Sequence, residues 1–266
     1  MSLNKKFIAS NYSSIAHLPG SKTFDSTDLT LSKTESSKFT DIRQLQFGEK
    51  IIVTEKLDGC NLGVVRQNND LICVIRKGYL CKDSPEPFIR NFEEYVEINR
   101  DRFLQLLVSG ERAVCEWMVK THSLGYRLPH EPCVILDIIK HCSFSRLPYL
   151  EMVERSTSVG FPVPGLIHMG IPINPYDLMV SVDRGLHGCE TVPEGLVYRL
   201  ERCNKFICIA KFVRSDFYSK VSFTELKQKS LELQKNFFFK FNKWGGSFRM
   251  SLKKYSVGTE YEKFIY

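Results

Sequence analysis

The middle of the chain alternates short apolar runs, rich in β-branched residues, with polar residues that favour turns. This pattern predicts β-strands, because branched and aromatic side chains suit a pleated, half-buried surface. The stretch Gln67-Asn68-Asn69-Asp70 lies between two such runs and predicts a hairpin turn. The predicted strands are residues 51–56, 61–66, 71–76, 112–118, 132–139, 196–201 and 206–212.

Helices are predicted where apolar residues recur at a spacing of three or four. The longest such stretch in the first half is residues 87–108, and Ser84 and Pro85 just before it offer a start signal. Further helices are predicted at 149–158, 176–182 and 223–244, whereas residues 11–37, rich in Ser, Thr and Asp, predict a loop or an extended arm. Strand follows strand more often than it alternates with helix. This order favours an α+β fold of mostly antiparallel sheets with flanking helices.

Length and composition indicate a globular intracellular protein. The 266 residues fit one main domain, expected at 1–219, with a helical extension at 220–266 packed on it. The nine cysteines are odd in number and contain no C-x-x-C, so neither a disulfide framework nor a zinc site is expected. The chain has no run of 18 apolar residues and no signal-peptide core, which predicts a soluble cytoplasmic or nuclear protein without a membrane partner.

The chain carries a net charge of +7 and has a pI near 8.9. A basic protein suits a polyanionic partner such as a nucleic acid, because neutralising phosphates releases counterions. Many basic proteins bind no nucleic acid, so the charge does not decide the class by itself.

The stretch with the clearest chemistry is Glu55-Lys56-Leu57-Asp58-Gly59-Cys60-Asn61, between two predicted strands. A lysine at a strand end can direct its amine into a pocket, while a glycine turn lets backbone amides approach phosphates. The amine is nucleophilic only when neutral, and its ordinary pKa is about 10.4. Burial or a neighbouring cation is therefore expected to lower the pKa of Lys56. The alternative is a surface hairpin, in which K-x-D-G is a common turn composition.

Charged residues in the predicted strands strengthen the first interpretation. Glu116 and Asp137 each lie inside an otherwise apolar run, where a carboxylate is costly without a partner. Arg76 ends a predicted strand twenty residues after Lys56, and Pro193-Glu194-Gly195 and Lys211-Phe212-Val213-Arg214 follow later. Each could form a structural ion pair. Together they supply a nucleophile, cations for phosphates, and acids for a divalent metal, which phosphoryl transfer requires.

The order of Lys56-x-Asp58-Gly59, Glu116, Leu136-Asp137, Glu194-Gly195 and Lys211 resembles motifs I, III, IIIa, IV and V of covalent nucleotidyltransferases. The match is closest to the ATP-dependent RNA ligases, in which Asn61 and the stretch from Glu116 through Tyr126 also have counterparts. The resemblance spans 55–214 and implies a nucleotidyltransferase domain that moves AMP from ATP to lysine, then to a 5′-phosphate. The 3′-hydroxyl of an RNA end finally displaces the AMP.

The resemblance also implies roles for the matching residues. Lys56 would form the lysyl-AMP bond, Glu116 would bind the ribose, and Glu194 would hold Mg²⁺ or Mn²⁺ with support from Asp137. Hard oxygen ligands suit these ions. The other expected nucleotide contacts are Glu55 at the adenine, Asp58, Gly59 and Asn61 in or near motif I, Arg76 and Lys211 at the phosphates, Leu136 at the base, and Arg214.

Two residues depart from the family pattern. An aromatic residue usually stacks on the base where this chain has Leu136, and motif V is often K-x-K where this chain places Arg214 three residues after Lys211. Base stacking is therefore lost or supplied elsewhere. Arg214 can replace the second lysine of K-x-K only if the geometry of the site accepts an arginine, since arginine and lysine are not interchangeable.

Two other functions are compatible with parts of the pattern. A GTP-dependent messenger-RNA capping enzyme shares the chemistry but usually has an OB-type domain after motif V, and a DNA ligase would carry a similar addition. A non-catalytic nucleic-acid-binding module could share the fold. His17 and His122 have no second histidine at metal-ligand spacing, which favours packing or hydrogen bonding. The Lys- and Phe-rich residues 233–244 could stack on nucleic acid, but packing on the main domain is the preferred interpretation.

Overall fold

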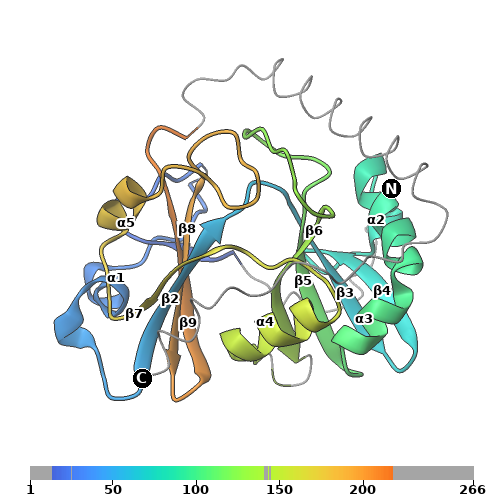
Figure 1. Ribbon diagram of the computed structural model, residues 1–266, viewed down its shortest axis with the longest axis horizontal. Helices are drawn as coiled ribbons and strands as arrows, with labels where there is room; N and C mark the ends of the chain where they lie inside the picture. Colours follow the sequence, from blue (N-terminus) through green and yellow to red (C-terminus); the bar gives the residue numbers. More distant parts are fainter. Residues whose placement is uncertain (1–13, 25, 141–142, 144, 218–266) are drawn as a thin grey trace.

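The structure is a computed structural model that describes residues 14–24, 26–140, 143 and 145–217. Two sheets form its centre (Figure 1). The first has the order β1-β9-β8-β2-β7 and the second β4-β3-β5-β6. The strands are β1 (Ala16–His17), β2 (Glu49–Lys56), β3 (Cys60–Gln67), β4 (Asp70–Ile75), β5 (Glu111–Trp117), β6 (Cys133–Lys140), β7 (Leu166–Gly170), β8 (Gly195–Arg202) and β9 (Lys205–Val213). All pairings are antiparallel except that of β1 with β9. The predicted α+β class with mostly antiparallel sheets is confirmed.

The strands form where the apolar pattern predicts them because their turns also have suitable residues. Asn68, in the β3–β4 hairpin, has φ 54°, a left-handed conformation that asparagine tolerates. Cys203 and Asn204 join β8 to β9 with φ of 50° and 57°, and two successive left-handed residues match the twist of the flanking strands. All seven predicted strands and the predicted hairpin are therefore confirmed, with boundaries shifted by one or two residues.

Helices pack against both sheets. The four-stranded sheet packs against α2 (Pro87–Ile98), α3 (Arg100–Leu106) and α4 (Tyr149–Ser158), and the core includes Phe92, Tyr95, Phe103 and Trp117. The five-stranded sheet packs against α1 (Lys33–Thr40) and α5 (Pro175–Ser181) through Phe39 and Leu178. Short 3₁₀ turns occupy η1 (Ile42–Gln44) and η2 (Cys81–Asp83). Among the described helices, none is long and apolar enough to cross a membrane.

The predicted helix at 87–108 is wrong in one respect, because the structure divides it into α2 and α3. Asn99 has φ −102° and ψ 21°, outside the helical range, and its side chain donates to the Tyr95 carbonyl at 2.9 Å. Asparagine side chains compete for backbone groups in this way and favour helix ends. The division lets Phe103 reach Phe161, at 4.6 Å between ring centroids, on the far side of the core.

The predicted loop at 11–37 is wrong for its later part, which begins α1. Ser32 accepts from the Glu35 backbone N–H at 3.2 Å, and the Glu35 carboxylate accepts from the Ser32 N–H at 2.9 Å. This reciprocal capping stabilises the start of a helix that has little apolar periodicity of its own. The two-residue strand β1 and the half-buried strand β7 were not predicted either. The predicted helix at 223–244 and the rest of the expected extension at 220–266 lie outside the described residues.

A buried ion-pair network joins the two sheets. Asp137 on β6 pairs with Arg199 on β8, at 3.3 Å between Oδ2 and Nη1, and with Arg146 in the loop before α4. Arg199 also donates to Glu201 at 2.8 Å, and Glu201 accepts from the Tyr149 N–H at the start of α4 at 2.7 Å. All three charged strand residues are at most 5% exposed. Removing one charge from such a network leaves the others buried without compensation.

We expect Asp137→Asn to lower the free energy of unfolding by about 3 kcal/mol, because Arg199 and Arg146 would lose their shared carboxylate. Urea denaturation measures the change. Asp41→Asn is the matched control, because its partner Arg43 is 84% exposed, and its cost should be much smaller than that of Asp137→Asn. Equal losses for the two variants would contradict the structural role of Asp137.

Candidate active site

The connection between β2 and β3 carries the chain from one sheet to the other (Figure 1). Lys56 is the last residue of β2 and lies opposite Gly195, the first residue of β8. This pairing brings Glu194 next to the lysine. The Lys56 Nζ lies 2.7 Å from Glu194 Oε2, and the two side chains are 23% and 6% exposed. A partly buried ammonium thus faces a buried carboxylate where the two sheets meet.

A second carboxylate reaches the same connection from β5. Glu116 accepts from the Gly59 backbone N–H at 3.0 Å and is hydrogen-bonded by Asn61, its partner in the β3–β5 register. A side chain at residue 59 has no room, since its Cβ would lie 2.9 Å from the Trp117 carbonyl oxygen. Glycine therefore allows the backbone to approach β5 closely enough for Glu116 to bind it.

The Asp58 carboxylate holds the loop after β5 by hydrogen bonds. Its Oδ2 accepts from the backbone N–H groups of Ser123 and Leu124 at 2.6 and 2.8 Å, and its own N–H donates to the Tyr126 hydroxyl at 3.3 Å. All of these groups are buried. A buried carboxylate that accepts two backbone donors fixes the loop after β5 relative to the strand that carries Lys56.

The electrostatics of the site are governed by the crowding of carboxylates around one ammonium. Burial lowers the pKa of Lys56, but Glu194, Glu116 and Asp58 outweigh it and hold that pKa above its ordinary value. Burial and the charge of Glu194 raise the pKa of Asp58 to about 7. The pKa of Glu116 is raised to about 7, first by burial, against the attraction of Lys56. The pKa of Lys56 is therefore raised rather than lowered as expected, because acids rather than cations surround the amine.

The cations of the site approach from β9 and from the end of β4. Burial and then the charge of Lys56 lower the pKa of Lys211, which is half-buried. Arg76 is exposed just after β4 and acts electrostatically on Lys211. Lys56, Glu194 and Lys211 thus interact across the first sheet, and Glu116 and Arg76 face them from the second.

Comparison with known proteins identifies the family of this arrangement. A sequence model of the RNA ligase family matches residues 49–213, from the start of β2 to the end of β9. The chain belongs to the RNA ligase family. No curated protein sequence matches it.

Solved RNA ligases share the fold. A structure of the Naegleria gruberi RNA ligase with PPi has 16% sequence identity and a TM-score of 0.51, covering 81% of this chain and 63% of that one. A lysine-to-alanine variant of the same ligase with ATP and Mn has 14% identity and a TM-score of 0.50, covering 85% and 63%. At these identities the likeness concerns the fold alone. The present chain spans somewhat less than two thirds of the length of these ligases.

Most of the predicted site residues of this RNA ligase family member lie together. Lys56, Asp58, Gly59, Asn61, Glu116 and Glu194 are joined by the contacts above, and Arg76 and Lys211 act on them electrostatically. Leu136 is half-buried and packs with an apolar cluster that contains Leu57, Leu124 and Tyr126. A base-binding role for Leu136 stays a prediction, and this cluster is the apolar surface nearest to motif I.

Two predicted residues have other partners. The carboxylate of Asp137 binds Arg199 and Arg146, and none of the described contacts links it to Lys56 or Glu194. The role of Asp137 as a support for the metal stays a prediction, and in this structure two cations already neutralise its carboxylate. Arg214 donates to the Pro193 carbonyl at 2.9 Å and to Asp216 at 2.6 Å. It therefore braces the loop that carries Glu194, rather than offering an unengaged charge to a phosphate.

Sequence reasoning missed two features of the site. The Glu55 carboxylate is buried, with Oε2 accepting from the Leu186 N–H at 2.6 Å and Oε1 lacking a hydrogen-bond partner. The sequence interpretation gave Glu55 a backbone contact with adenine, but its backbone N–H donates to the Gly165 carbonyl. The second feature is the segment around His17, which acts electrostatically on Lys211 and Lys56. Neither feature could be predicted from the spacing of residues in the sequence, because both sets of contacts join residues that are far apart in the chain.

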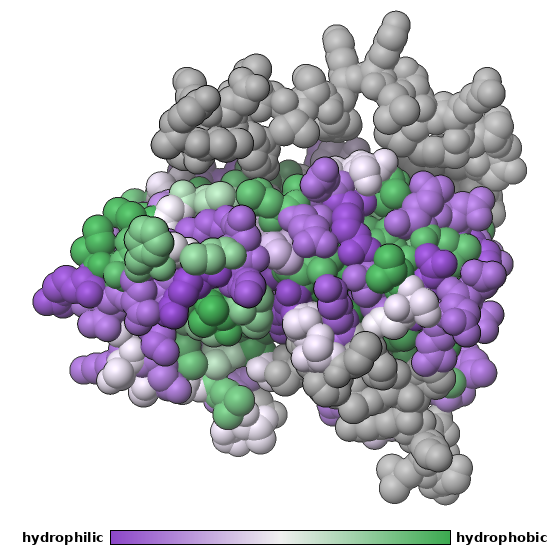
Figure 2. Space-filling view, turned by 90° about the horizontal axis from the view of Figure 1, so that it is seen from below, coloured by the Kyte–Doolittle hydropathy of each residue, from purple (hydrophilic) through white to green (hydrophobic). Residues whose placement is uncertain are grey.

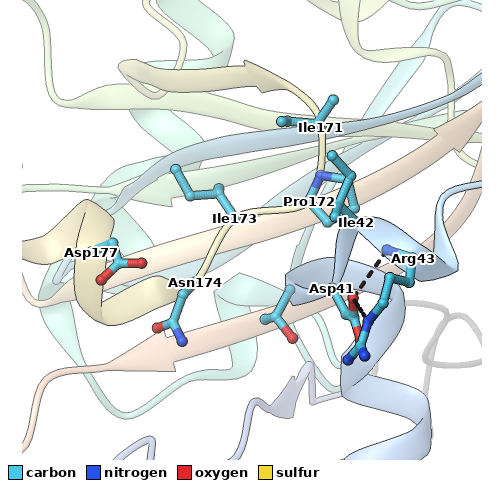
Figure 3. A pocket seen from close by; sticks show the side chains of 9 residues that line it. Asp41, Ile42, Arg43, Ile171, Pro172, Ile173, Asn174 and Asp177 are labelled. Atoms are coloured by element: carbon cyan, nitrogen blue, oxygen red, sulfur yellow. Dashed lines mark hydrogen bonds and ion pairs between the residues drawn. The ribbon is translucent and has the colours of Figure 1, made fainter.

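A surface pocket elsewhere in the described chain is lined by none of the predicted site residues. It lies between the end of α1 and the β7–α5 connection, with Asp41, Arg43, Ile171 and Asn174 on its walls (Figure 3). Apolar and hydrophilic side chains are interspersed over the lower face of the molecule (Figure 2). The pocket lining includes none of the residues arranged around Lys56.

We expect Glu55→Gln to make stability less sensitive to pH. Burial raises the pKa of Glu55 from 4.5 to about 7. Between these pH values the Glu55 carboxyl is ionised in the unfolded chain but keeps its proton in the folded chain. The stabilisation of the folded chain that is present below pH 4.5 is therefore lost as the pH rises to about 7. As the pH rises from 5 to 8, the free energy of unfolding of the variant should increase by about 2 kcal/mol relative to that of wild type. Urea denaturation at each pH measures this difference. The exposed Glu97→Gln is the control, and identical pH profiles for wild type and Glu55→Gln would contradict this account.

Proposed function

We propose that this chain is an ATP-dependent RNA ligase that forms a covalent lysyl-AMP intermediate at Lys56. The observation that carries the proposal is the placement of Lys56 Nζ 2.7 Å from Glu194 Oε2, at the junction of the two sheets and inside the region matched by the family. Glu116 and Asp58 complete the surroundings of the amine. A structure of a Naegleria gruberi ligase variant contains ATP and Mn, which supports a nucleotide and a divalent metal as ligands here.

Lys56 is the nucleophile in this proposal. Its amine attacks the α-phosphorus of ATP, a nitrogen–phosphorus bond forms, and pyrophosphate leaves. The amine must first lose its proton, whereas its contact with Glu194 favours the ammonium form. Glu194 and Glu116 therefore keep Lys56 charged and unreactive until a ligand changes their environment. Glu116 and Asp58, each with a pKa near 7, are the nearby groups able to accept a proton at neutral pH.

Glu194 is the residue that would hold a divalent metal. Within the described residues, no three His, Cys, Asp or Glu side chains gather into a preformed metal site. One or two carboxylates together with substrate phosphates are the usual ligands of Mg²⁺, so a single buried glutamate fits this mode of binding. A bound metal ion would supply positive charge to the phosphates. Glu194 would then hold the metal, while in the structure it is the carboxylate that most strongly favours the Lys56 ammonium.

The remaining residues divide between the ribose and the phosphates. Glu116 would accept from a ribose hydroxyl, with its orientation fixed by Gly59 and Asn61. Lys211 and Arg76 would neutralise the phosphates, since they are the cations nearest to Lys56 across the two sheets. Lys211 is placed to stabilise the charge that develops on the transferred phosphate.

RNA with 5′-phosphate and 3′-hydroxyl ends is the proposed partner of the later steps. After adenylylation, an oxygen of the 5′-phosphate would attack the lysyl-AMP phosphorus and release the Lys56 amine. A 3′-hydroxyl would then attack the activated 5′-phosphate, with AMP as the leaving group. The RNA ligase family match supports RNA rather than DNA.

We expect wild-type protein incubated with ATP and Mg²⁺ or Mn²⁺ to gain one AMP, and Lys56→Ala to gain none. Intact-protein mass spectrometry measures the adduct, with GTP in parallel. Lys50→Ala, on the same strand but paired with Asn204 and Glu201, is the matched control and should keep the adduct. Glu194→Ala should slow adduct formation by about 100-fold or more, because the charge on the phosphates is no longer offset.

Substantial labelling of Lys56→Ala would contradict the assignment of the nucleophile. Added GMP instead of AMP would indicate capping chemistry. If protein already carrying AMP is ruled out, the absence of any adduct would favour a nucleic-acid-binding module. Joining of a 5′-phosphorylated RNA to a 3′-hydroxyl RNA by the wild type, compared with the DNA equivalents, tests the proposed partner.

A further inference from the structure

Two loops that contact the site, the β5–β6 loop and the α5–β8 loop, are hydrogen-bonded to each other. The Arg127 N–H donates to the Gly188 carbonyl at 2.8 Å, and the Glu190 N–H donates to the Gly125 carbonyl at 3.0 Å. Gly188 has φ 72°, and a Cβ there would lie 2.2 Å from the Arg127 carbonyl oxygen. Glycine at this position therefore allows the close approach of the two loops.

Two histidines add a side-chain contact between the same loops. His130 Nε2 lies 2.5 Å from His187 Nδ1, with the two rings at 79° and their centroids 4.8 Å apart. His130 Nδ1 lies 2.6 Å from the Glu131 carbonyl oxygen, which can only accept, so Nδ1 carries the proton of this ring. Nε2 of a neutral His130 is then an acceptor, and His187 Nδ1 donates to it.

The histidine pair is enclosed and uncharged. His187 is 5% exposed and also contacts the backbone of Val163, in the segment before β7. Burial, followed by His130, lowers the pKa of His187 to about 4, and burial also lowers the pKa of His130. Both rings are therefore neutral at physiological pH, and no charge repulsion opposes their contact.

The position of His130 is fixed by the core of the second sheet. The carboxylate of its neighbour Glu131 accepts from the Tyr95 hydroxyl at 2.6 Å. The same carboxylate accepts from Arg102 Nη1 and Nη2 at 2.9 and 2.5 Å. Tyr95 belongs to α2 and Arg102 to α3, so these bonds tie the end of the β5–β6 loop to two helices. His130 therefore presents Nε2 from a well-anchored backbone.

His187 connects this anchor to Glu55, the residue before Lys56 on β2. The Leu186 N–H donates to Glu55 Oε2 at 2.6 Å. A Cβ at Gly185 would lie 2.6 Å from Glu55 Oε1, so the backbone of the α5–β8 loop lies directly against this carboxylate. Because His187 follows Leu186 in the chain, fixing its ring also fixes the backbone that covers Glu55.

We propose that His130 and His187 are positioning residues that hold the α5–β8 loop against Glu55, in the arrangement that binds ATP beside Lys56. The proposal rests on the proposed adenylylation of Lys56. Neither histidine belongs to a motif found in the sequence, and neither touches the nucleotide in this role. Loss of their contact lowers the population of the loop position that binds ATP, which weakens binding and leaves the chemical step nearly unchanged.

Single-turnover adenylylation, followed by intact-protein mass spectrometry, tests the proposal. His187→Leu and His130→Leu should each raise the ATP concentration for half-maximal rate by about 5-fold, with the maximal rate changed by less than about 2-fold. The double variant should be no worse than either single variant, because both remove the same contact. His187→Asn should restore binding, since its amide N–H can replace Nδ1–H as the donor to His130. His168→Leu, on β7, is the control and should behave as wild type, because its ring binds the Ile171 carbonyl instead.

Amide hydrogen exchange examines the loop without any turnover. The Leu186 amide should exchange about 5-fold faster in both leucine variants than in wild type, and at nearly the wild-type rate in His187→Asn. The Ile135 amide, which donates to the Pro162 carbonyl at 2.9 Å at β6, should keep its wild-type rate and so show that the fold is intact.

Unchanged exchange of Leu186 in both leucine variants would overturn the proposal. Faster exchange of Ile135 alongside Leu186 would also overturn it, since the histidines would then stabilise the whole fold rather than one loop. A lower maximal rate at an unchanged half-saturating ATP concentration would contradict the positioning role as well. Failure of the proposed function is distinct, because wild-type protein would then form no AMP adduct, whereas the exchange of Leu186 would still report on the loop.

Discussion

One ammonium and three carboxylates share a partly buried site where the two sheets meet, and much of the local structure follows from this crowding. Lys56 ends one sheet, and Glu194, Glu116 and Asp58 converge on it from β8, β5 and the turn itself. Burial and the neighbouring carboxylates raise the pKa values of Asp58 and Glu116 to about 7. A site with this balance favours a cation such as a divalent metal ion.

The rest of the fold keeps these groups in place from several directions. The Asp137–Arg199–Glu201 network joins β6 to β8 and to the start of α4, and so fixes the relative position of the two sheets. Asp58 fastens the loop after β5, and Arg214 braces the loop before β8. Buried ion pairs add little net stability compared with apolar packing, but they fix geometry once formed. The placement of charges in this chain thus serves the precision of the site more than its stability.

The sequence predicted features that depend on local pattern or on motif order. The strands from β2 to β6 followed from alternating apolar residues, and the grouping of Lys56, Glu116 and Glu194 followed from the family resemblance. The break at Asn99 was missed because α2 and α3 share one apolar face, and the break depends on a single side chain that binds a backbone carbonyl. Helix α1 was missed because capping by Ser32 and Glu35, rather than periodicity, starts it. Asp137 was assigned to the metal because its buried charge was evident, whereas its partners Arg146 and Arg199 are brought to it only by the tertiary fold.

The pair of Lys56 and Glu194 also explains how a lysine with a raised pKa can belong to a nucleophilic site. A permanently neutral amine in a buried position would be exposed to unproductive reactions, whereas an ammonium bound to Glu194 is inert. The same glutamate is the residue suited to a metal, and it cannot serve both partners fully at once. Under the proposed function, loss of the contact with Glu194 would remove the main stabilisation of the ammonium, and burial would then dominate the pKa of Lys56. In this view the ion pair is the resting state of the nucleophile, and competition for Glu194 couples occupation of the site to activation of the amine.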